Sequence, residues 1–125
     1  MYRVSVQKTF TAQHYLVGGD WGVENKLHSH PYRLDLELGG YDLDQHQYLV
    51  DIVAIENVLE QIIELVRDKT LNELPGFTGV NPSLEYFARW LCEALSAKID
   101  ASNIQRVTVR LWESDIAWAG YELER

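Results

Sequence analysis

Three of the four histidines occur where their side chains can meet. His28 and His30 are two residues apart in a segment that alternates polar and apolar residues, so both project from the same side of a strand. His14 ends an earlier alternating segment, also on its apolar side, and antiparallel pairing would place it beside them. Three imidazoles without a thiolate form the ligand set of a catalytic zinc, which keeps a fourth position open for water or substrate. The spacing therefore predicts a Zn²⁺ site at these three residues.

The alternative for each histidine is an ordinary structural role. A single inward-facing histidine is more often a hydrogen-bonded core residue than a metal ligand, and the pair His28 and His30 alone is weak evidence. The third histidine, on the neighbouring strand, is what favours metal binding. His46 lies in a polar turn, residues 42–46, and is interpreted as a solvated loop residue.

Glu113 continues the apolar face formed by Val107, Val109 and Leu111. A buried carboxylate is costly unless hydrogen-bond donors meet it. Two interpretations stay open at this point. Glu113 either accepts hydrogen bonds from adjacent N–H groups of a ligand, or it has already left the sheet at a turn formed by the next two residues.

Periodicity predicts the elements that position these residues. Alternation over residues 2–15, interrupted at Lys8, and over residues 28–38 predicts two half-buried strands joined by a glycine-rich loop. Helical spacing predicts a helix over residues 51–67 with Asp51 as N-cap, and a second helix with Asn81 as N-cap and Pro82 at its first position. Two more alternating segments close the chain. The order ββααββ predicts one α+β domain over residues 1–125, with both helices on one face of an antiparallel four-stranded sheet.

Composition limits the classes of partner. The net charge of −8 argues against nucleic-acid or anionic-membrane surfaces, which require clustered Lys and Arg. The single cysteine, Cys92, allows no intramolecular disulfide, and this favours a reducing compartment, the cytoplasm. We see neither a secretory signal nor an apolar run of about 20 residues. The expected partner is a small molecule.

Six segments, in order along the whole chain, resemble the 6-pyruvoyl-tetrahydropterin synthase and 6-carboxy-tetrahydropterin synthase family. The segments are Phe10-Thr11-Ala12-Gln13-His14 (F-x-A-x-H), His28-Ser29-His30-Pro31-Tyr32 (H-G-H-x-Y), Leu49-Val50-Asp51 (V-D-F), Asp68-Lys69-Thr70-Leu71-Asn72 (D-H-x-x-L-N, one residue shorter), Asn81-Pro82-Ser83-Leu84-Glu85 (N-P-T-x-E) and Trp112-Glu113-Ser114 (E-T). The resemblance implies the tunnelling fold, in which trimers form a barrel of strands and two trimers stack into a homohexamer. It also implies active sites that lie between subunits.

The resemblance implies roles for the residues that match. His14, His28 and His30 match the family's zinc ligands. Glu113 matches the carboxylate that anchors the pterin, while Glu85 and Ser83 stand where the family has another pterin-side carboxylate and a hydroxyl. Asp68 matches the acid of the catalytic relay if a one-residue gap follows it; without the gap it falls on the relay histidine and Arg67 falls on the acid.

Two positions depart from the family pattern. The family's cysteine, four residues before the first histidine of the pair, is Glu24 here, and the relay histidine is replaced by Lys69 or Asp68 depending on the gap. We predict Glu24 as a general base and Lys69 as a proton carrier or phosphate-binding cation, with Asp68 as the third catalytic candidate. The alternatives are a solvated loop residue for Glu24 and an exposed cation at a helix C-terminus for Lys69.

Three functions remain compatible with these residues. The first is a zinc-dependent lyase that cleaves the side chain of a dihydroneopterin-type pterin, such as 7,8-dihydroneopterin triphosphate, by a retro-aldol reaction to a 6-hydroxymethyl-dihydropterin. The second is a 6-carboxy- or 6-pyruvoyl-tetrahydropterin synthase with an altered relay. The third is a pterin- or purine-binding protein without catalysis.

Overall fold

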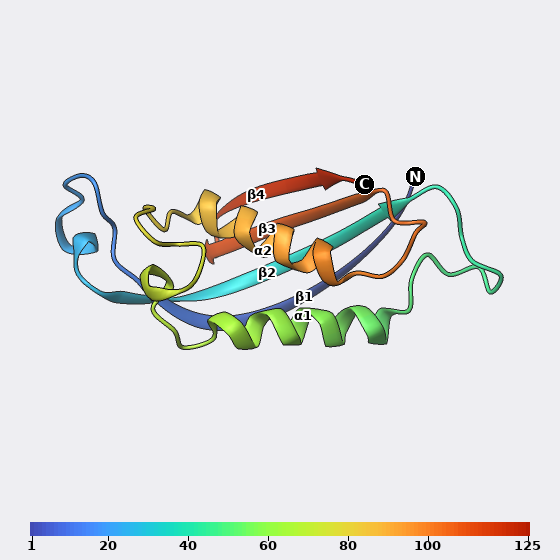
Figure 1. The fold of residues 1–125 in the computed structure, drawn as a ribbon, viewed down its shortest axis with the longest axis horizontal. Coiled ribbons are helices and arrows are strands. Elements are labelled where there is room, and N and C mark those ends of the chain that lie inside the picture. Colours follow the sequence, from blue (N-terminus) through green and yellow to red (C-terminus); the bar gives the residue numbers. More distant parts are fainter.

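The computed structural model describes residues 1–125 and contains an antiparallel sheet covered on one face by two helices (Figure 1). The strands are β1 (Tyr2–His14), β2 (His28–Gly40), β3 (Arg106–Ser114) and β4 (Ala117–Glu124), and they lie in the order β1-β2-β3-β4. The helices are α1 (Ile52–Val66) and α2 (Leu84–Lys98). The predicted ββααββ order and α+β class are confirmed.

The long β1–β2 pairing sets the position of the histidines. Its register runs without interruption from Tyr2 opposite Gly40 to His14 opposite His28, and it places Ala12 opposite His30. Because side chains alternate between the two faces of a strand, this register brings His14, His28 and His30 to the same face. That face is the one that the helices cover.

The core lies between this face of the sheet and the two helices. Each strand contributes the apolar side of its alternation, and each helix contributes a stripe at helical spacing. The largest fully buried side chains are Tyr32, Phe77, Phe87, Leu34, Leu36, Leu38, Leu59, Ile62, Ile63, Leu71, Leu91 and Leu95. Burying each such side chain contributes about 1.5–3 kcal/mol, so the core holds the strand register that the histidines depend on.

The two helix starts differ in how well sequence predicted them. Asp51 caps α1 as expected, because its side chain accepts a hydrogen bond from the amide of Val53 at 3.0 Å. The prediction for α2 was wrong: Ser83, not Asn81, is the N-cap, and its Oγ accepts from the amide of Tyr86 at 3.1 Å. Asn81 is unavailable as a cap because its Oδ1 accepts from the amide of Val17 at 2.9 Å.

Two short 3₁₀ helices, η1 (Gly22–Asn25) and η2 (Leu71–Glu73), lie in the loops near the histidines. The segment before η2 adds to the free edge of β1. There the amide of Asp68 donates to the carbonyl of Thr11 at 2.7 Å, and the amide of Gln13 donates to the carbonyl of Lys69 at 2.9 Å. Asp68 adopts the left-handed conformation, with φ of 57°, at this turn out of α1.

Neither α1 nor α2 has the length and apolar character that a membrane-spanning helix requires.

Candidate metal centre

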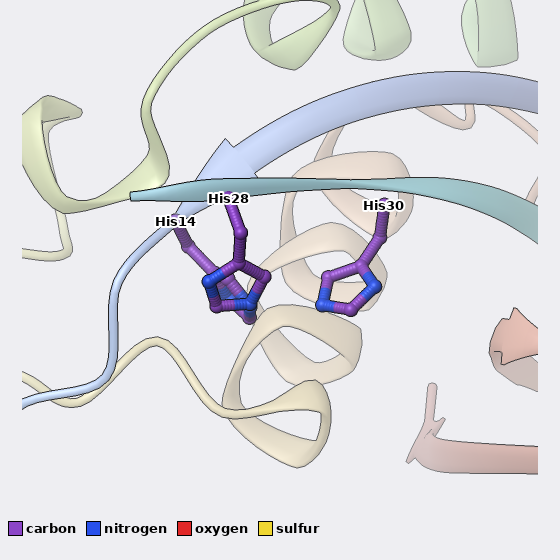
Figure 2. A group of neighbouring side chains, drawn as sticks. All are labelled: His14, His28 and His30. Carbon is purple, nitrogen blue, oxygen red and sulfur yellow. The ribbon is translucent and has the colours of Figure 1, made fainter. Parts of the chain in front are cut away.

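Three imidazole rings converge at the end of the β1–β2 pair (Figure 2). Figure 2 shows the side chains of His14, His28 and His30 pointing to the same side of the two strands. The ring centroids are 4.6 Å apart for His14 and His28, 4.8 Å for His28 and His30, and 5.1 Å for His14 and His30. Their candidate ligand nitrogens all lie within 4.8 Å of one another. One ion can therefore be reached from all three rings with small side-chain rotations.

Backbone carbonyls fix the ring orientation of two of these histidines. The Nδ1 of His14 lies 2.9 Å from the carbonyl oxygen of Pro82, and the Nδ1 of His28 lies 2.8 Å from that of Lys26. A carbonyl oxygen only accepts, so each Nδ1 carries the proton and donates it. Each Nε2 then keeps a lone pair, as in metal-bound histidines whose other nitrogen donates to a backbone carbonyl.

The buried nitrogen of His28 provides the test of whether a metal fits. The Nε2 of His28 is buried and has no hydrogen-bond partner. A buried acceptor without a partner costs free energy. A Zn²⁺ ion held by the three imidazoles would give this nitrogen a partner, so the donor set fits the metal.

His14 is the most buried of the three, with 4% of its surface exposed. Burial lowers the pKa of His14, and repulsion from the charged forms of His28 and His30 acts in the same direction. The hydrogen bond to Pro82 and the nearby carboxylate of Glu24 oppose this lowering of the pKa. The net effect keeps His14 neutral, which is the form that binds metal.

A cavity of about 210 Å³ opens beside the histidines. Besides the candidate ligands His14 and His30, four of the predicted site residues line it. Leu16, Trp21 and Leu84 also line it, and no signal in the sequence indicated a site role at these three positions. The complete lining is His14, Leu16, Trp21, Glu24, His30, Asn81, Ser83, Leu84, Glu85 and Glu113. The structure thus brings Glu24, Ser83, Glu85 and Glu113 to one place, although they come from three separate segments.

Glu113 reaches this cavity because of a bulge. Trp112 pairs with Trp118 and Ser114 pairs with Ala117, so Glu113 is the extra residue between two pairs. A bulge re-aims the side chain of its extra residue and occurs frequently beside active sites. The interpretation that Glu113 has left the sheet at a turn of the next two residues was wrong, because β3 continues to Ser114 and the turn is formed by residues 115 and 116. Glu113 lines the cavity, and its role as an acceptor for a ligand stays a prediction.

The start of α2 supplies a second wall. Ser83 and Glu85 stand at its first turn, and the carbonyl of Pro82 immediately before them holds His14. Asn81 ties the same wall to the β1–β2 loop through the amide of Val17. The segment that the sequence predicted only as a helix start therefore also orients His14, a candidate metal ligand.

Tyr32 lies under the site, with its ring centroid 5.7 Å from that of His30. Burial, together with the negative charge of Glu113, raises the pKa of Tyr32, so its hydroxyl stays protonated. The alternation over residues 28–38 predicted that Tyr32 is buried. It did not predict that Tyr32 lies near Glu113.

The structure does not bring Asp68 and Lys69 to this cavity. Both side chains are exposed at the outer edge of β1, and neither lines the cavity of the same chain. Their backbone is held there by the hydrogen bonds to Thr11 and Gln13.

Three carboxylates, Glu24, Glu85 and Glu113, face the cavity and give it acidic character. Carboxylates bind N–H donors and cations rather than phosphates.

The architecture and this site together define a tunnelling-fold protein with a candidate three-histidine metal centre. The tunnelling fold expected from sequence is confirmed by comparison with solved structures.

The family profile for 6-pyruvoyl tetrahydropterin synthase matches residues 3–124, so the chain belongs to this family. It is similar to a candidate 6-carboxy-5,6,7,8-tetrahydropterin synthase of Pyrococcus horikoshii, with 21% identity over 90% of this chain and 84% of that protein. The 6-pyruvoyl tetrahydropterin synthase of Caenorhabditis elegans superposes with a TM-score of 0.79 and 19% identity, over 99% of this chain and 98% of that one. A Plasmodium vivax 6-pyruvoyltetrahydropterin synthase in which a catalytic glutamate is replaced by alanine has a TM-score of 0.81 and 14% identity, over the same shares.

Proposed function

We propose that this protein is a Zn²⁺-dependent lyase that acts on the side chain of a dihydroneopterin-type pterin. The observation that carries the proposal is the meeting of Glu24 with His14 and His30 in one cavity. Glu24 stands where the synthases resembled by this chain have cysteine. The Plasmodium vivax synthase with a catalytic glutamate shows that a protein of this fold can use this residue type.

The acidic wall of the cavity suits the ring of such a substrate. The amino-pyrimidine edge of a pterin presents adjacent N–H donors, and Glu113 and Glu85 are the acceptors that face the cavity. The hydroxyl of Ser83 already accepts from the amide of Tyr86, and its proton stays free to donate to a ring nitrogen or oxygen. We propose these three residues as the substrate-binding group.

The three imidazoles would hold Zn²⁺ against the hydroxyls of the side chain, where the ion supplies Lewis acidity and lowers the pKa of a bound hydroxyl. Glu24 takes the proton from the 2′-hydroxyl as general base. The C1′–C2′ bond breaks, C2′ leaves as an aldehyde, and the electron pair passes to C1′ and the dihydropterin ring. A proton returned to C1′ completes the 6-hydroxymethyl-dihydropterin.

We also propose that the chain acts as a homohexamer, a dimer of trimers, as its family resemblance implies. β1 and β4 end the sheet, and exposed sheet edges favour pairing with another chain. Asp68 and Lys69, held at the β1 edge, would then serve a cavity on a neighbouring copy rather than their own. In this proposal they carry protons or meet the substrate's phosphates there.

The alternative within the same family is a 6-carboxy- or 6-pyruvoyl-tetrahydropterin synthase with an altered relay, which the family match favours. A pterin- or purine-binding protein without catalysis is the alternative of another class. The three functions differ in product: a hydroxymethyl-pterin, a carboxy- or pyruvoyl-pterin, or none with the ligand still bound.

The test is to incubate the Zn²⁺-loaded protein with 7,8-dihydroneopterin triphosphate and identify the pterin product by mass spectrometry. The proposal expects a 6-hydroxymethyl-dihydropterin that is lost in Glu24→Gln and His28→Ala. Glu56→Gln, a matched change at an exposed glutamate of α1, should retain the product. A carboxy- or pyruvoyl-pterin from the wild-type protein would favour the synthase, and bound but unchanged pterin would favour the non-catalytic alternative.

A further inference from the structure

The loop between β1 and β2 carries two residues of the cavity lining, Trp21 and Glu24. Its residues 15–27 contain little regular structure beyond the 3₁₀ turn Gly22–Asn25. A loop of this kind holds its side chains in place only if its own backbone groups are tied together.

A single side chain, that of Asn25, makes three hydrogen bonds to the backbone of this loop. Its Nδ2 donates to the carbonyls of Leu16 and Gly19, each at 3.0 Å, and its Oδ1 accepts from the amide of Trp21 at 2.7 Å. Only a carboxamide offers donors and an acceptor together, since a carboxylate accepts only. The Asn25 side chain is therefore matched to the backbone that surrounds it.

These hydrogen bonds position the two cavity residues, Trp21 and Glu24. The amide of Leu16 donates to the carbonyl of Glu24 at 2.9 Å, which closes the base of the loop beside Asn25. The Trp21 ring packs over Gly19, where an added Cβ would come within 2.6 Å of the ring. The Asn25 contacts and the Leu16–Glu24 hydrogen bond therefore hold the backbone that carries Trp21 and Glu24.

We propose that Asn25 is a positioning residue that holds the loop in the form that presents Glu24 and Trp21 to the cavity. Asn25 does not itself line the cavity. The role of Glu24 as general base rests on the proposed function. The conformation of the loop and the position of Trp21 are independent of that role. A carboxylate at residue 25 would lose the two donated hydrogen bonds, so the carboxamide is required there.

The first test uses Co²⁺ in place of Zn²⁺, because it binds imidazole sites and quenches the fluorescence of nearby indoles. The quenching due to Trp21 is the difference between the wild-type protein and Trp21→Phe, measured at Co²⁺ concentrations that saturate each variant. In Asn25→Ala this Trp21-specific quenching should fall, and amide hydrogen exchange over residues 16–24 should rise. Asn25→Asp keeps the acceptor and loses both donors. Its Trp21-specific quenching and its exchange should therefore lie between the values of the wild-type protein and those of Asn25→Ala.

Asn103→Ala is the matched control. The Asn103 side chain likewise donates to two loop carbonyls, those of Asp42 at 2.8 Å and Leu49 at 2.9 Å. Residues 41–50 form the loop at the opposite end of the molecule from the β1–β2 loop (Figure 1). Asn103→Ala should leave both the Trp21 quenching and the exchange of residues 16–24 at wild-type values.

The second test is kinetic and applies to whichever pterin the wild-type protein turns over. Misplacement of a catalytic group by about 1 Å reduces rates on the order of 100-fold, so kcat should fall by roughly that factor in Asn25→Ala at unchanged metal content. Wild-type quenching and wild-type exchange in Asn25→Ala would overturn the positioning role. Absence of turnover in a wild-type protein that binds Co²⁺ would count against the proposed function alone, because neither loop measurement requires turnover.

Discussion

The Nδ1 atoms of His14 and His28 both donate to backbone carbonyls, and this leaves their Nε2 lone pairs free for a metal ion. Pre-oriented imidazoles lose little side-chain entropy when they bind a metal. His30 completes the group from the same strand as His28. At the scale of single residues, this arrangement predicts one metal ion per chain.

The metal stoichiometry gives the first prediction. The purified protein should bind about one Zn²⁺ per chain, and His28→Ala should lose stoichiometric binding, because removing one of three ligands leaves too few for a catalytic zinc. Elemental analysis after dialysis measures this. His46→Ala, a change in the loop of residues 41–50, is the control and should keep one ion; equal metal content in all three proteins would argue against this site.

The second prediction concerns Cys92, which is fully buried and 3.5 Å from the carbonyl of Val107. Burial raises the pKa of the Cys92 thiol to about 11, from 9.0. At pH 8 the native thiol should react with a disulfide reagent only slowly, and denaturant should release fast reaction. Because the unfolded thiol ionises first, the free energy of unfolding should decline as pH rises from about 9 to about 11. Rapid labelling of the native protein at pH 8 would contradict the burial.

At the scale of elements, the start of α2 combines two tasks on adjacent residues. Ser83 caps the helix, while Asn81 holds the β1–β2 loop and Pro82 holds His14. The site and the helix therefore share one short segment. A change there has different effects depending on which residue is replaced.

The third prediction separates these tasks. Ser83→Ala should reduce the free energy of unfolding by about 1 kcal/mol, which is the usual loss for a removed N-cap. Asn81→Ala should leave the start of α2 intact and increase amide exchange at Val17, whose hydrogen-bond acceptor it removes. Denaturant unfolding and hydrogen exchange measure the two effects, and increased exchange in the first turn of α2 in Asn81→Ala would restore Asn81 as the cap.

The fourth prediction tests how α1 packs on the sheet. Leu59 is 1% exposed, whereas Leu65 in the same helix is 52% exposed. Leu59→Ala should lower the free energy of unfolding by about 2–5 kcal/mol, because it removes buried contacts and leaves a cavity. Leu65→Ala should change it by less than about 1 kcal/mol, since alanine is also the better helix former. Equal losses for the two variants would contradict this orientation of α1.

At the scale of the whole molecule, the sheet ends at β1 and β4, and apolar side chains are exposed near the β3–β4 turn. Ile116 is 92% exposed and Trp118 is 50% exposed. Exposed aromatic and aliphatic side chains beside a free sheet edge favour association between chains.

The fifth prediction is therefore the proposed hexamer. Light scattering should give a native mass about six times the 14.5 kDa of one chain. Ile116→Lys with Trp118→Lys should lower that mass, because the charges would be buried without partners in an interface. The matched change Val23→Lys, at a residue 80% exposed on the β1–β2 loop, should not lower the mass. A wild-type mass of one chain would exclude the hexamer.

The sequence by itself determined the elements and the residue types at the centre of the site. Alternation and helical spacing are local properties, so they predicted the four strands and both helices, and they placed His14, His28 and His30 on one inward face. The predicted ends differ from the observed ones by one or two residues, as at Tyr15, which lies just beyond β1.

Only the tertiary structure decided which distant residues meet. Asn81 and Ser83 are both good caps by type, and a contact with Val17, 64 residues away, removes Asn81 from that role. The bulge at Glu113, the loop tied by Asn25 and the exposed position of Lys69 likewise depend on contacts outside their own segments. Periodicity records which side of an element is buried, but it carries no information about what each side chain faces; packing and hydrogen bonds between segments decide that.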